Sequence, residues 1–273
     1  MLSSLDESGM TDLRDPVWIR LCLECEDIAQ NEPVLRRFVD RAILSHSDFG
    51  QAVAGLLAIK LGGAEVNSED LASVFGEAIG SGQGIVASAK ADLLAIVDRD
   101  PACHRLIDPF LFFKGWQAVQ AHRIAHHFWK RNKKDLAYFI QSRTSSITST
   151  DIHPAARIGN GIMIDHAHDV VIGETCVIED NVSLMQGVTL GGNGKETGDR
   201  QPKIRQGVLI GAGAKILGNI EIGRGSRVAA GSVVLHSVPP NTTVAGIPAK
   251  VVGSSGSTEP ARIMNHQIEA DEG

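Results

Sequence analysis

Aromatic side chains are scarce in this chain. Three Trp, one Tyr and eight Phe make up 4% of its 273 residues, although apolar residues as a whole make up 43%. A core of this composition is filled by aliphatic side chains rather than by rings. Four cysteines are too few for a disulfide framework in a chain of this length, which favours a reducing compartment.

Long apolar runs and basic tracts are also missing. No stretch of about 18 apolar residues is present, so we expect no transmembrane helix. The segment from Met1 to Asp15 is polar and acidic and lacks the apolar core of a signal peptide, so we expect a cytoplasmic protein. The net charge is −6 and no basic tract stands out, which argues against nucleic-acid binding.

What the chain does have is a six-residue repeat. Aliphatic residues recur at Ile152, Ile158, Ile164, Ile172, Ile178, Leu184, Leu190, Ile204, Ile210, Ile216, Ile222, Val228 and Val234. A helix repeats near 3.6 residues and an ordinary strand at 2, so this period predicts short strands joined by turns, three to a coil, as in a parallel β-helix. Glycines follow the repeated residue at Gly159, Gly173, Gly211 and Gly223, where we expect corners to need a permissive backbone.

The residues before the repeat have helical periodicity. Their apolar faces predict a helical bundle from residue 16 to about 148, with one helix running from Leu111 to Trp129. The period changes near Thr148 to Asp151. We therefore expect an α+β chain of three parts, an α-helical domain at 1–148, a β-helix at 149–253 and a flexible polar tail at 254–273.

Two steps of the repeat are too long. The step from Ile164 to Ile172 is eight residues, and the step from Leu190 to Ile204 is fourteen. The longer step contains the polar, glycine-rich segment from Gly191 to Lys203, which predicts a loop outside the coil. Loops on a rigid scaffold often carry function, so this loop is a candidate part of a site.

Acidic residues and histidines gather near the shorter irregular step. With about 18 residues in a coil, Asp151 and His166 are expected on adjacent coils near one corner. A carboxylate there would orient the imidazole, which would then accept a proton from an alcohol near neutral pH. The alternative is that Asp151, His153, Asp165, His166 and His168 are solvated corner residues.

Metal and redox motifs are incomplete. The spacing of His153, His166 and His168 does not specify a zinc site. His122 and His126 have i, i+4 spacing, but Arg123 stands where a zinc H-E-x-x-H motif needs Glu, so we expect ordinary helix histidines and no metal. The Cys22-x-x-Cys25 pair lies in a predicted helix without the βαβ context of a redox motif.

Several segments taken together resemble serine O-acetyltransferases, a family within the hexapeptide-repeat acyltransferases. The matching segments are Arg99-Asp-Pro-Ala, Leu111-Phe-Phe-Lys-Gly, Asp151-Ile-His-Pro-Ala-Ala, Ile164-Asp-His-Ala, Val188-Thr-Leu-Gly-Gly, Gly198-Asp-Arg and Ala245-Gly-Ile-Pro-Ala-Lys. The repeat alone is typical of hexapeptide acyltransferases in general, and the N-terminal half makes the resemblance specific. The resemblance implies a left-handed β-helix, an N-terminal domain for oligomerisation that also lies on the substrate side, and acetyl transfer from acetyl-CoA to the hydroxyl of L-serine.

The resemblance also implies roles for individual residues. His166 would be the general base and Asp151 its orienting partner. Asp100 and Asp165 would contact the substrate ammonium group, and Arg200 its carboxylate. The residues that would lie along coenzyme A are Gly192, Gly211, Ala212, Ala230 and Lys250. Sites would lie between the subunits of a trimer, with two trimers forming a hexamer, and L-cysteine would inhibit at the serine site as the end product of cysteine biosynthesis.

Two positions depart from the family pattern. Gln201 stands where the family usually has His, and we expect it to hydrogen-bond substrate rather than to move protons. The printed chain ends at Gly273, whereas the family docks into O-acetylserine sulfhydrylase through a terminal Ile, so that partnership is left open. Other functions that remain open are acetyl transfer to a sugar or another hydroxyl acceptor, a metal-dependent lyase on the same fold, and a non-catalytic scaffold.

Overall fold

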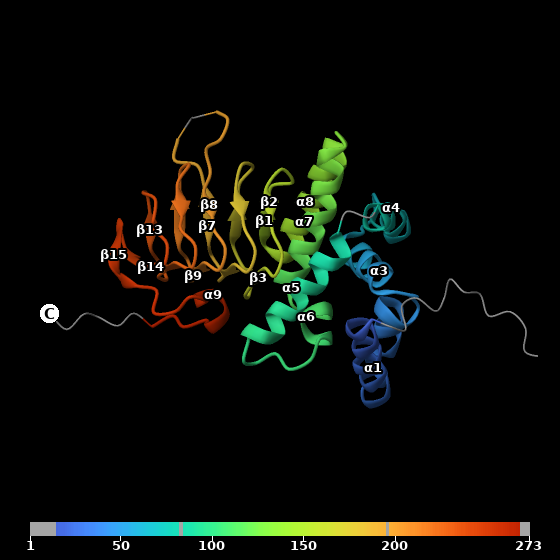
Figure 1. The fold of residues 1–273 in the computed structure, drawn as a ribbon. Coiled ribbons are helices and arrows are strands. Elements are labelled where there is room, and N and C mark those ends of the chain that lie inside the picture. The colour runs from blue at the N-terminus through green and yellow to red at the C-terminus, as the bar shows by residue number, and fades with distance from the viewer. Residues whose placement is uncertain (1–14, 82–83, 195–196, 268–273) are drawn as a thin grey trace, which may run out of the picture.

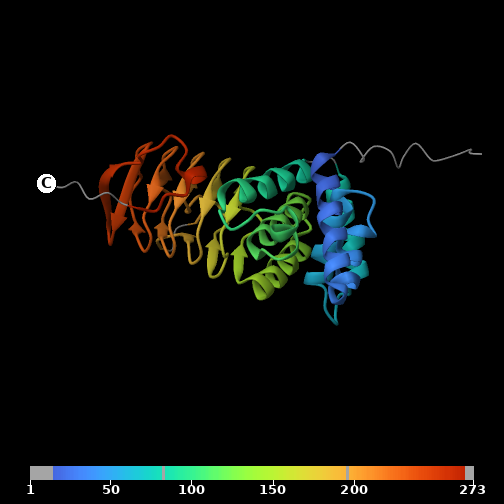
Figure 2. The same cartoon turned by 90° about the horizontal axis from the view of Figure 1, so that it is seen from below.

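The computed structural model describes residues 15–81, 84–194 and 197–267. The molecule is elongated, with the helices at one end and the β-helix at the other (Figure 1, Figure 2). No helix in the described ranges is both long and apolar enough to cross a membrane.

The N-terminal region is built from eight α-helices and two short helical turns within the described residues. They are α1 Pro16–Asn31, η3 Pro33–Leu35, α2 Arg36–Val39, η4 Asp40–Leu44, α3 Phe49–Leu61, α4 Ser68–Gly80, α5 Ile85–Arg99, α6 Ile107–Leu111, α7 Lys114–Lys130 and α8 Lys134–Thr148. Local sequence explains several of their ends. Asp15 caps α1 by accepting a hydrogen bond from Val17 N, and Pro16 occupies the first helical position, where its missing N–H costs nothing.

The helix predicted from Leu111 to Trp129 is present as α7, but its predicted start is three residues too early. Helix α6 ends at Leu111, and Phe113 is extended before α7 begins at Lys114. The break leaves backbone carbonyls at the end of α6 without helical partners. The side-chain amide of Gln117 satisfies two of them, donating to Phe110 O at 3.1 Å and Leu111 O at 2.9 Å.

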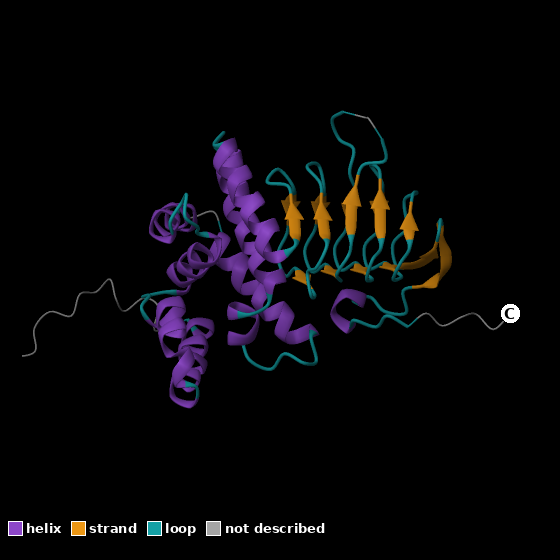
Figure 3. Ribbon diagram, turned by 180° about the vertical axis from the view of Figure 1, so that it is seen from behind, coloured by secondary structure: helices purple, strands orange, loops and turns teal. Residues whose placement is uncertain are grey.

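The repeat region is a parallel β-helix, as predicted. Its strands are β1 Thr150–Ile152, β2 Arg157–Ile158, β3 Met163–Ile164, β4 Val170–Ile172, β5 Val177–Ile178, β6 Ser183–Leu184, β7 Thr189–Gly191, β8 Lys203–Ile204, β9 Leu209–Ile210, β10 Lys215–Leu217, β11 Glu221–Ile222, β12 Arg227–Val228, β13 Val233–Val234, β14 Thr242–Gly246 and β15 Ala249–Ser254. Up to β13, every third strand joins the same sheet, and β14 and β15 extend the third sheet beyond β12. The orders are β1-β4-β7-β10-β13, β2-β5-β8-β11 and β3-β6-β9-β12-β14-β15. Figure 3 shows these rows of strands and the loop between β7 and β8 projecting from the coil.

The repeated aliphatic residues fill the interior of the coil. Ile152 pairs in register with Ile172 and Ile172 with Leu190, so like residues stack from one coil to the next. Ile204, Ile210 and Ile216 are fully buried. This narrow stack of aliphatic side chains confirms the interpretation of the six-residue period.

The corner glycines are needed for a different reason from the one expected. None of the four that follow the repeated residue has a backbone φ in the left-handed region. A Cβ at Gly211 would instead lie 2.6 Å from Ala230 N and 3.0 Å from Ala229 C on the next coil. These glycines therefore provide space for the neighbouring coil rather than conformational freedom.

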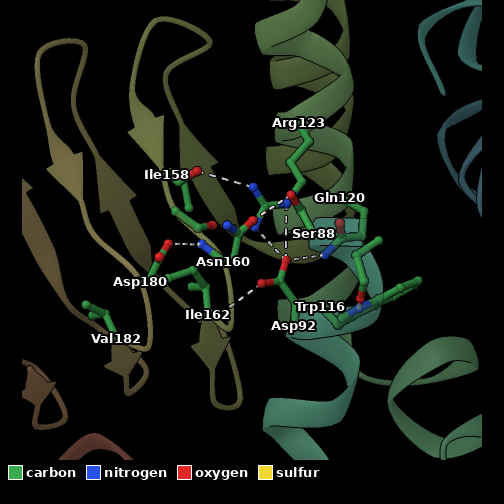
Figure 4. Close-up of polar contacts among 12 residues, drawn as sticks. Ser88, Asp92, Trp116, Gln120, Arg123, Ile158, Asn160, Ile162, Asp180 and Val182 are labelled. Carbon is green, nitrogen blue, oxygen red and sulfur yellow. Dashed lines mark hydrogen bonds and ion pairs between the residues drawn. The ribbon is translucent and has the colours of Figure 1, made fainter. Parts of the chain in front are cut away.

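Helices α5 and α7 join the helical domain to the first coil. The buried Asp92 carboxylate accepts from Arg123 Nη2 at 2.7 Å and from Ile162 N at 2.8 Å, so it bridges α5, α7 and the coil (Figure 4). Gln120 Nε2 donates to the same carboxylate at 3.0 Å. This joint sets the position of α7 against the strands that carry the candidate site.

The C-terminal segment, where we expected a flexible tail, packs back on the molecule in its described part. Strand β15 pairs antiparallel with β14, and a short helix α9 Pro260–Ile263 follows. Ser183 Oγ donates to the carbonyl of the buried Ala261 at 2.8 Å, and Arg262 pairs with Asp98 of α5 at 2.8 Å. Residues 268–273 of the predicted tail lie outside the described residues.

Candidate active site

His166 lies at the corner after β3, within the eight-residue step. Its backbone φ is 56°, and that of Ala167 is 58°. Both values lie in the left-handed region, which residues other than glycine rarely adopt. The His166 side chain is 72% exposed, and its Nε2 lies 3.5 Å from Asp165 Oδ2. Such a backbone persists only where the surroundings enforce it, and it presents the imidazole to solvent.

Two contacts hold this corner. Ala167 is fully buried, and its carbonyl accepts from Thr150 Oγ1 at 2.7 Å. Gly115 near the start of α7 lies so close that a Cβ there would overlap the carbonyl oxygen of Ile164. The helical domain and the first coil together therefore enforce the conformation of His166.

Asp100 and Asp165 lie in the same region as His166. Asp100 follows the last residue of α5, and its Oδ1 accepts from Ala102 N at 2.8 Å. Burial raises the pKa of the Asp165 carboxyl; the neighbouring His166 lowers it and Asp100 raises it. The structure thus brings together the two carboxylates assigned to the ammonium group and the candidate base.

Asp151 lies in β1 and is held by a different partner. Its Oδ1 accepts from Gln141 Nε2 of α8 at 2.6 Å. Among the described residues, the imidazole of His166 is not a hydrogen-bond partner of this carboxylate. The adjacency of the two coils is nevertheless present, because Thr150 next to Asp151 donates to the carbonyl of Ala167.

Arg200 and Gln201 lie at another corner. We call the turns after β3, β6, β9 and β12 the His166 corner, and the turns after β1, β4, β7 and β10 the loop corner. Arg200 Nη2 donates to Glu174 Oε2 of the loop corner at 2.8 Å. Gln201 is 7% exposed, and its Oε1 accepts from Thr175 N at 2.7 Å and from Thr175 Oγ1 at 2.5 Å.

Most of the residues assigned to coenzyme A lie along the His166 corner on later coils. Gly211 N donates to Val228 O at 2.8 Å, and Gly231 N donates to Ala212 O at 2.7 Å, so Gly211, Ala212 and Ala230 form a strip of small residues. Lys250 is exposed in β15 and pairs with Ala245. Gly192 lies instead at the loop corner, beside Arg200.

Sequence reasoning missed three residues near these corners. Thr175 binds both Arg200 and Gln201, since its Oγ1 accepts from their backbone N–H groups at 3.1 and 3.0 Å. Gly115 lies against the His166 corner. The sequence signal for it was a glycine in the first turn of a helix, directly after Lys114. His266 of the C-terminal segment lowers the pKa of Asp165, but no periodicity marks this residue.

No group of three or more His, Cys, Asp or Glu residues is placed to hold a metal ion in the described part of the chain. The candidate site contains an exposed imidazole, carboxylates and a strip of small residues, with an extruded loop at another corner. Together with the coil, this arrangement is typical of acyl transfer by a base to an acceptor hydroxyl.

Comparison with known proteins agrees with this class. A family profile described as the N-terminal region of serine acetyltransferase matches residues 17–121, and one described as bacterial transferase hexapeptide repeats matches residues 201–236. The chain is 49% identical to the serine acetyltransferase of Salmonella typhimurium over 92% of both proteins.

Solved structures are similar over most of the chain. Serine acetyltransferase of Brucella abortus in complex with coenzyme A is 51% identical, with a TM-score of 0.86 over 88% of this chain and 96% of that one. A serine acetyltransferase in complex with cysteine is 47% identical, with a TM-score of 0.90 over 93% of this chain and 98% of that one.

The fold and the site define a hexapeptide-repeat acyltransferase. More particularly, the chain belongs to the serine acetyltransferase family, because relatives close to half identical match it over nearly its whole length.

Proposed function

We propose that this protein transfers the acetyl group of acetyl-CoA to the hydroxyl of L-serine, giving O-acetyl-L-serine and CoA in cysteine biosynthesis. The observation that carries the proposal is the cluster of Asp100, Asp165 and His166 at one corner of the coil. Two carboxylates suit an ammonium group, and the exposed imidazole suits an alcohol. Family membership supports both the donor and the acceptor.

His166 acts as the general base in this proposal. Its imidazole takes the proton of the serine hydroxyl, and the alkoxide attacks the carbonyl carbon of the thioester. The tetrahedral intermediate then collapses and breaks the carbon–sulfur bond. The leaving CoA sulfur takes the proton from the imidazolium. CoA then leaves as the thiol, and the imidazole is neutral again for the next turnover.

Asp151 is proposed to orient the imidazole of His166 in the assembled enzyme. The hydrogen bond from Gln141 to Oδ1 fixes the direction of this carboxylate. An oriented carboxylate would select the imidazole tautomer and stabilise the imidazolium that forms during transfer. Gln141 thereby becomes a positioning residue for the carboxylate.

The substrate carboxylate is proposed to bind Arg200, assisted by Gln201. Arg200 lies at the loop corner and His166 at a different corner of the same chain, which supports a site formed between two copies. Burial and the two bonds to Thr175 support a role for Gln201 in holding the loop as well. We propose a trimer, and two trimers in a hexamer, as the assembly that brings the two corners together.

The strip of small residues is proposed to take the coenzyme A arm. Ala212 and Ala230 have small side chains that would let the arm approach the corner that carries His166, and the buried Gly211 lets their two coils pack closely. Lys250 would meet a phosphate from the last coil, and Gly192 would face the arm from the loop corner. The complex of the Brucella abortus relative with coenzyme A supports this assignment.

L-Cysteine is proposed as an inhibitor at the serine position. Cysteine has the same ammonium and carboxylate groups as serine, so Asp100, Asp165 and Arg200 would hold it equally well. A family member solved in complex with cysteine supports the proposal.

Thiol release from acetyl-CoA in the presence of L-serine tests the proposed function. The His166→Ala variant is expected to lose about 100-fold or more of the activity, the usual contribution of a positioned base. His168→Ala is the matched control, because His168 is also an exposed corner imidazole, 60% exposed, and should leave the rate nearly unchanged.

Two outcomes would contradict the proposal. Serine-dependent release that survives His166→Ala would remove the imidazole from the mechanism. Release with a sugar or another hydroxyl acceptor, and none with serine, would assign the enzyme to a different acceptor class.

A further inference from the structure

A second polar pocket lies away from both corners of the proposed site. It has a volume of about 260 Å³ and lies between α7, the start of α5 and strand β2. Its ionisable lining residues are His122, Arg123, His126, His127, Lys130 and Arg157, and no carboxylate is among the described residues that line it. We call it the basic pocket.

Arg123 forms the inner wall of the basic pocket and is already neutralised. Its guanidinium pairs with the fully buried Asp92, and it also donates to Ile158 O at 3.2 Å and Gly159 O at 2.6 Å (Figure 4). The positive charge that remains in the pocket belongs to Lys130 and Arg157. Neither makes an ion pair with a carboxylate in the part of the chain that the structure describes.

His127 presents an unused donor. It is 2% exposed, and its Nδ1 lies 3.0 Å from Arg131 Nη1. A guanidinium nitrogen can only donate, so Nδ1 accepts and the proton of the neutral ring lies on Nε2. Nε2 is buried and has no hydrogen-bond partner among the described residues. A buried donor without an acceptor is rare and indicates a missing acceptor.

His122 adds a second unpartnered nitrogen. It is 5% exposed, and its Nδ1 is buried without a described partner. His126 is oriented by the contact of its Nδ1 with Pro154 O at 2.8 Å. His122 also makes a hydrogen bond with the backbone of Ala156, so the donor that remains open belongs to His127. That donor and two exposed cations without a carboxylate ion pair lie around one cavity.

We propose that the basic pocket binds a small tetrahedral oxyanion, such as phosphate or sulfate. The two cations and the unused N–H donor of His127 suit an anion with several acceptor oxygens. Lys130 and Arg157 are exposed at the rim of the pocket. An oxyanion that reaches both side chains would replace their hydrating water with charge-assisted hydrogen bonds. A water molecule takes roughly 30 Å³, so the pocket holds an oxyanion together with several waters.

The titration of the histidines gives the proposal a pH dependence. Burial lowers the pKa of His122, His126 and His127, and nearby positive charges act in the same direction. The charged or titratable groups that face these rings are Arg123, Lys130, Arg131, Lys133, His153, Arg157 and Glu77, of which only Glu77 is acidic. A bound dianion would favour the protonated rings, so sulfate, which does not titrate near neutrality, should bind more tightly as the pH falls.

Calorimetric titration of the full chain with sulfate and with phosphate, against chloride at equal ionic strength, tests the proposal. Saturable binding is expected for both oxyanions. Lys130→Gln and Arg157→Gln should each weaken it about tenfold, because a charge-assisted hydrogen bond is lost. Arg36→Gln, which removes an exposed cation of α2 outside this pocket, should bind like the wild type.

Activity and competition complete the test. Serine-dependent thiol release by Lys130→Gln and Arg157→Gln should equal that of the wild type, and coenzyme A should not displace sulfate. Non-saturable stabilisation that is equal in all variants would be a general salt effect and would overturn the proposal. So would displacement by coenzyme A, or a change of oligomeric state in Arg157→Gln, which would assign the pocket to a carboxylate of a second copy.

Discussion

At the scale of single residues, a glycine positions the proposed base, and a buried glutamine and a threonine position the loop. Gly115 brings α7 into contact with the carbonyl of Ile164, two residues before His166. Gln201 and Thr175 hold the return of the extruded loop, and Arg200 therefore leaves that loop in a defined direction. None of these three residues has a proposed role in the chemical step itself.

Gly115→Ala should lower serine-dependent thiol release about tenfold or more. The added methyl group overlaps the carbonyl of Ile164, so either α7 or the His166 corner must move, and a misplacement near 1 Å costs up to about 100-fold in rate. Steady-state kinetics measures the loss. Gly76→Ala in α4 is the control, because its Cβ meets nothing within 4 Å. Equal activity of both variants would show that the corner does not depend on this contact.

Gln201→His should change turnover by less than about tenfold. The Gln201 amide is buried against Thr175 and is not placed to move protons. Thr175→Val, which removes the hydroxyl that binds Arg200 and Gln201, should instead raise KM for serine. Measurement of kcat and KM for both variants separates the two effects. A gain of several-hundred-fold for Gln201→His would identify a proton-transfer position, since general acid–base catalysis contributes about 100-fold or more.

At the scale of elements, α5 and α7 fix the helical domain to the coil. The buried Asp92 accepts hydrogen bonds from α7 and from the backbone of Ile162. Arg123 in turn donates to the carbonyls of Ile158 and Gly159. Because the same first coil carries His166, the joint couples the stability of the helical domain to the geometry of the site.

Asp92→Asn should lower the free energy of unfolding by about 3 kcal/mol, the usual cost of breaking one partner of a buried ion pair. Denaturant unfolding measures the change. Asp98→Asn on the same helix is the matched control. Its carboxylate pairs with Arg262 near the surface, with 44% of the side chain exposed, so its loss should cost less than about 1 kcal/mol. Equal effects would mean that Asp92 is not a buried anchor.

At the scale of the whole molecule, one chain does not bring all the proposed site residues to one place. Asp100, Asp165 and His166 lie at the His166 corner, whereas Arg200, Gln201 and Gly192 lie at the loop corner. Neighbouring copies around a three-fold axis would bring one corner of each chain against another corner of the next. The active unit in this proposal is therefore an oligomer.

Coexpression of His166→Ala and Arg200→Ala chains tests the shared site. Each variant alone should be nearly inactive. Random mixed oligomers should recover about a quarter of wild-type activity, because each of the two neighbours that form a site is intact in about half of the cases. Thiol release by the purified mixture measures the recovery. No recovery in verified mixed oligomers would place the complete site within one chain.

Periodicity and spacing predicted the coil and the irregular step that carries His166, because they depend only on which side chains point inward. Other features were beyond such patterns. The break between α6 and α7 depends on Gln117 reaching two carbonyls, and the burial of Gln201 depends on Thr175 of another coil. The corner glycines were located correctly, but for the wrong physical reason, because the neighbouring coil is not visible in the local sequence.

The sequence by itself determined the parallel coil, the helical region before it and the types of residue that the chemistry needs, since a period of six buries one aliphatic residue per strand. The tertiary structure alone decided which of those residues meet. It places Asp165 beside His166 and Asp151 in a hydrogen bond with Gln141. It also places two buried histidines and two cations around a second pocket. These outcomes depend on contacts between segments far apart in the chain, where packing of one element against another fixes the position of each side chain.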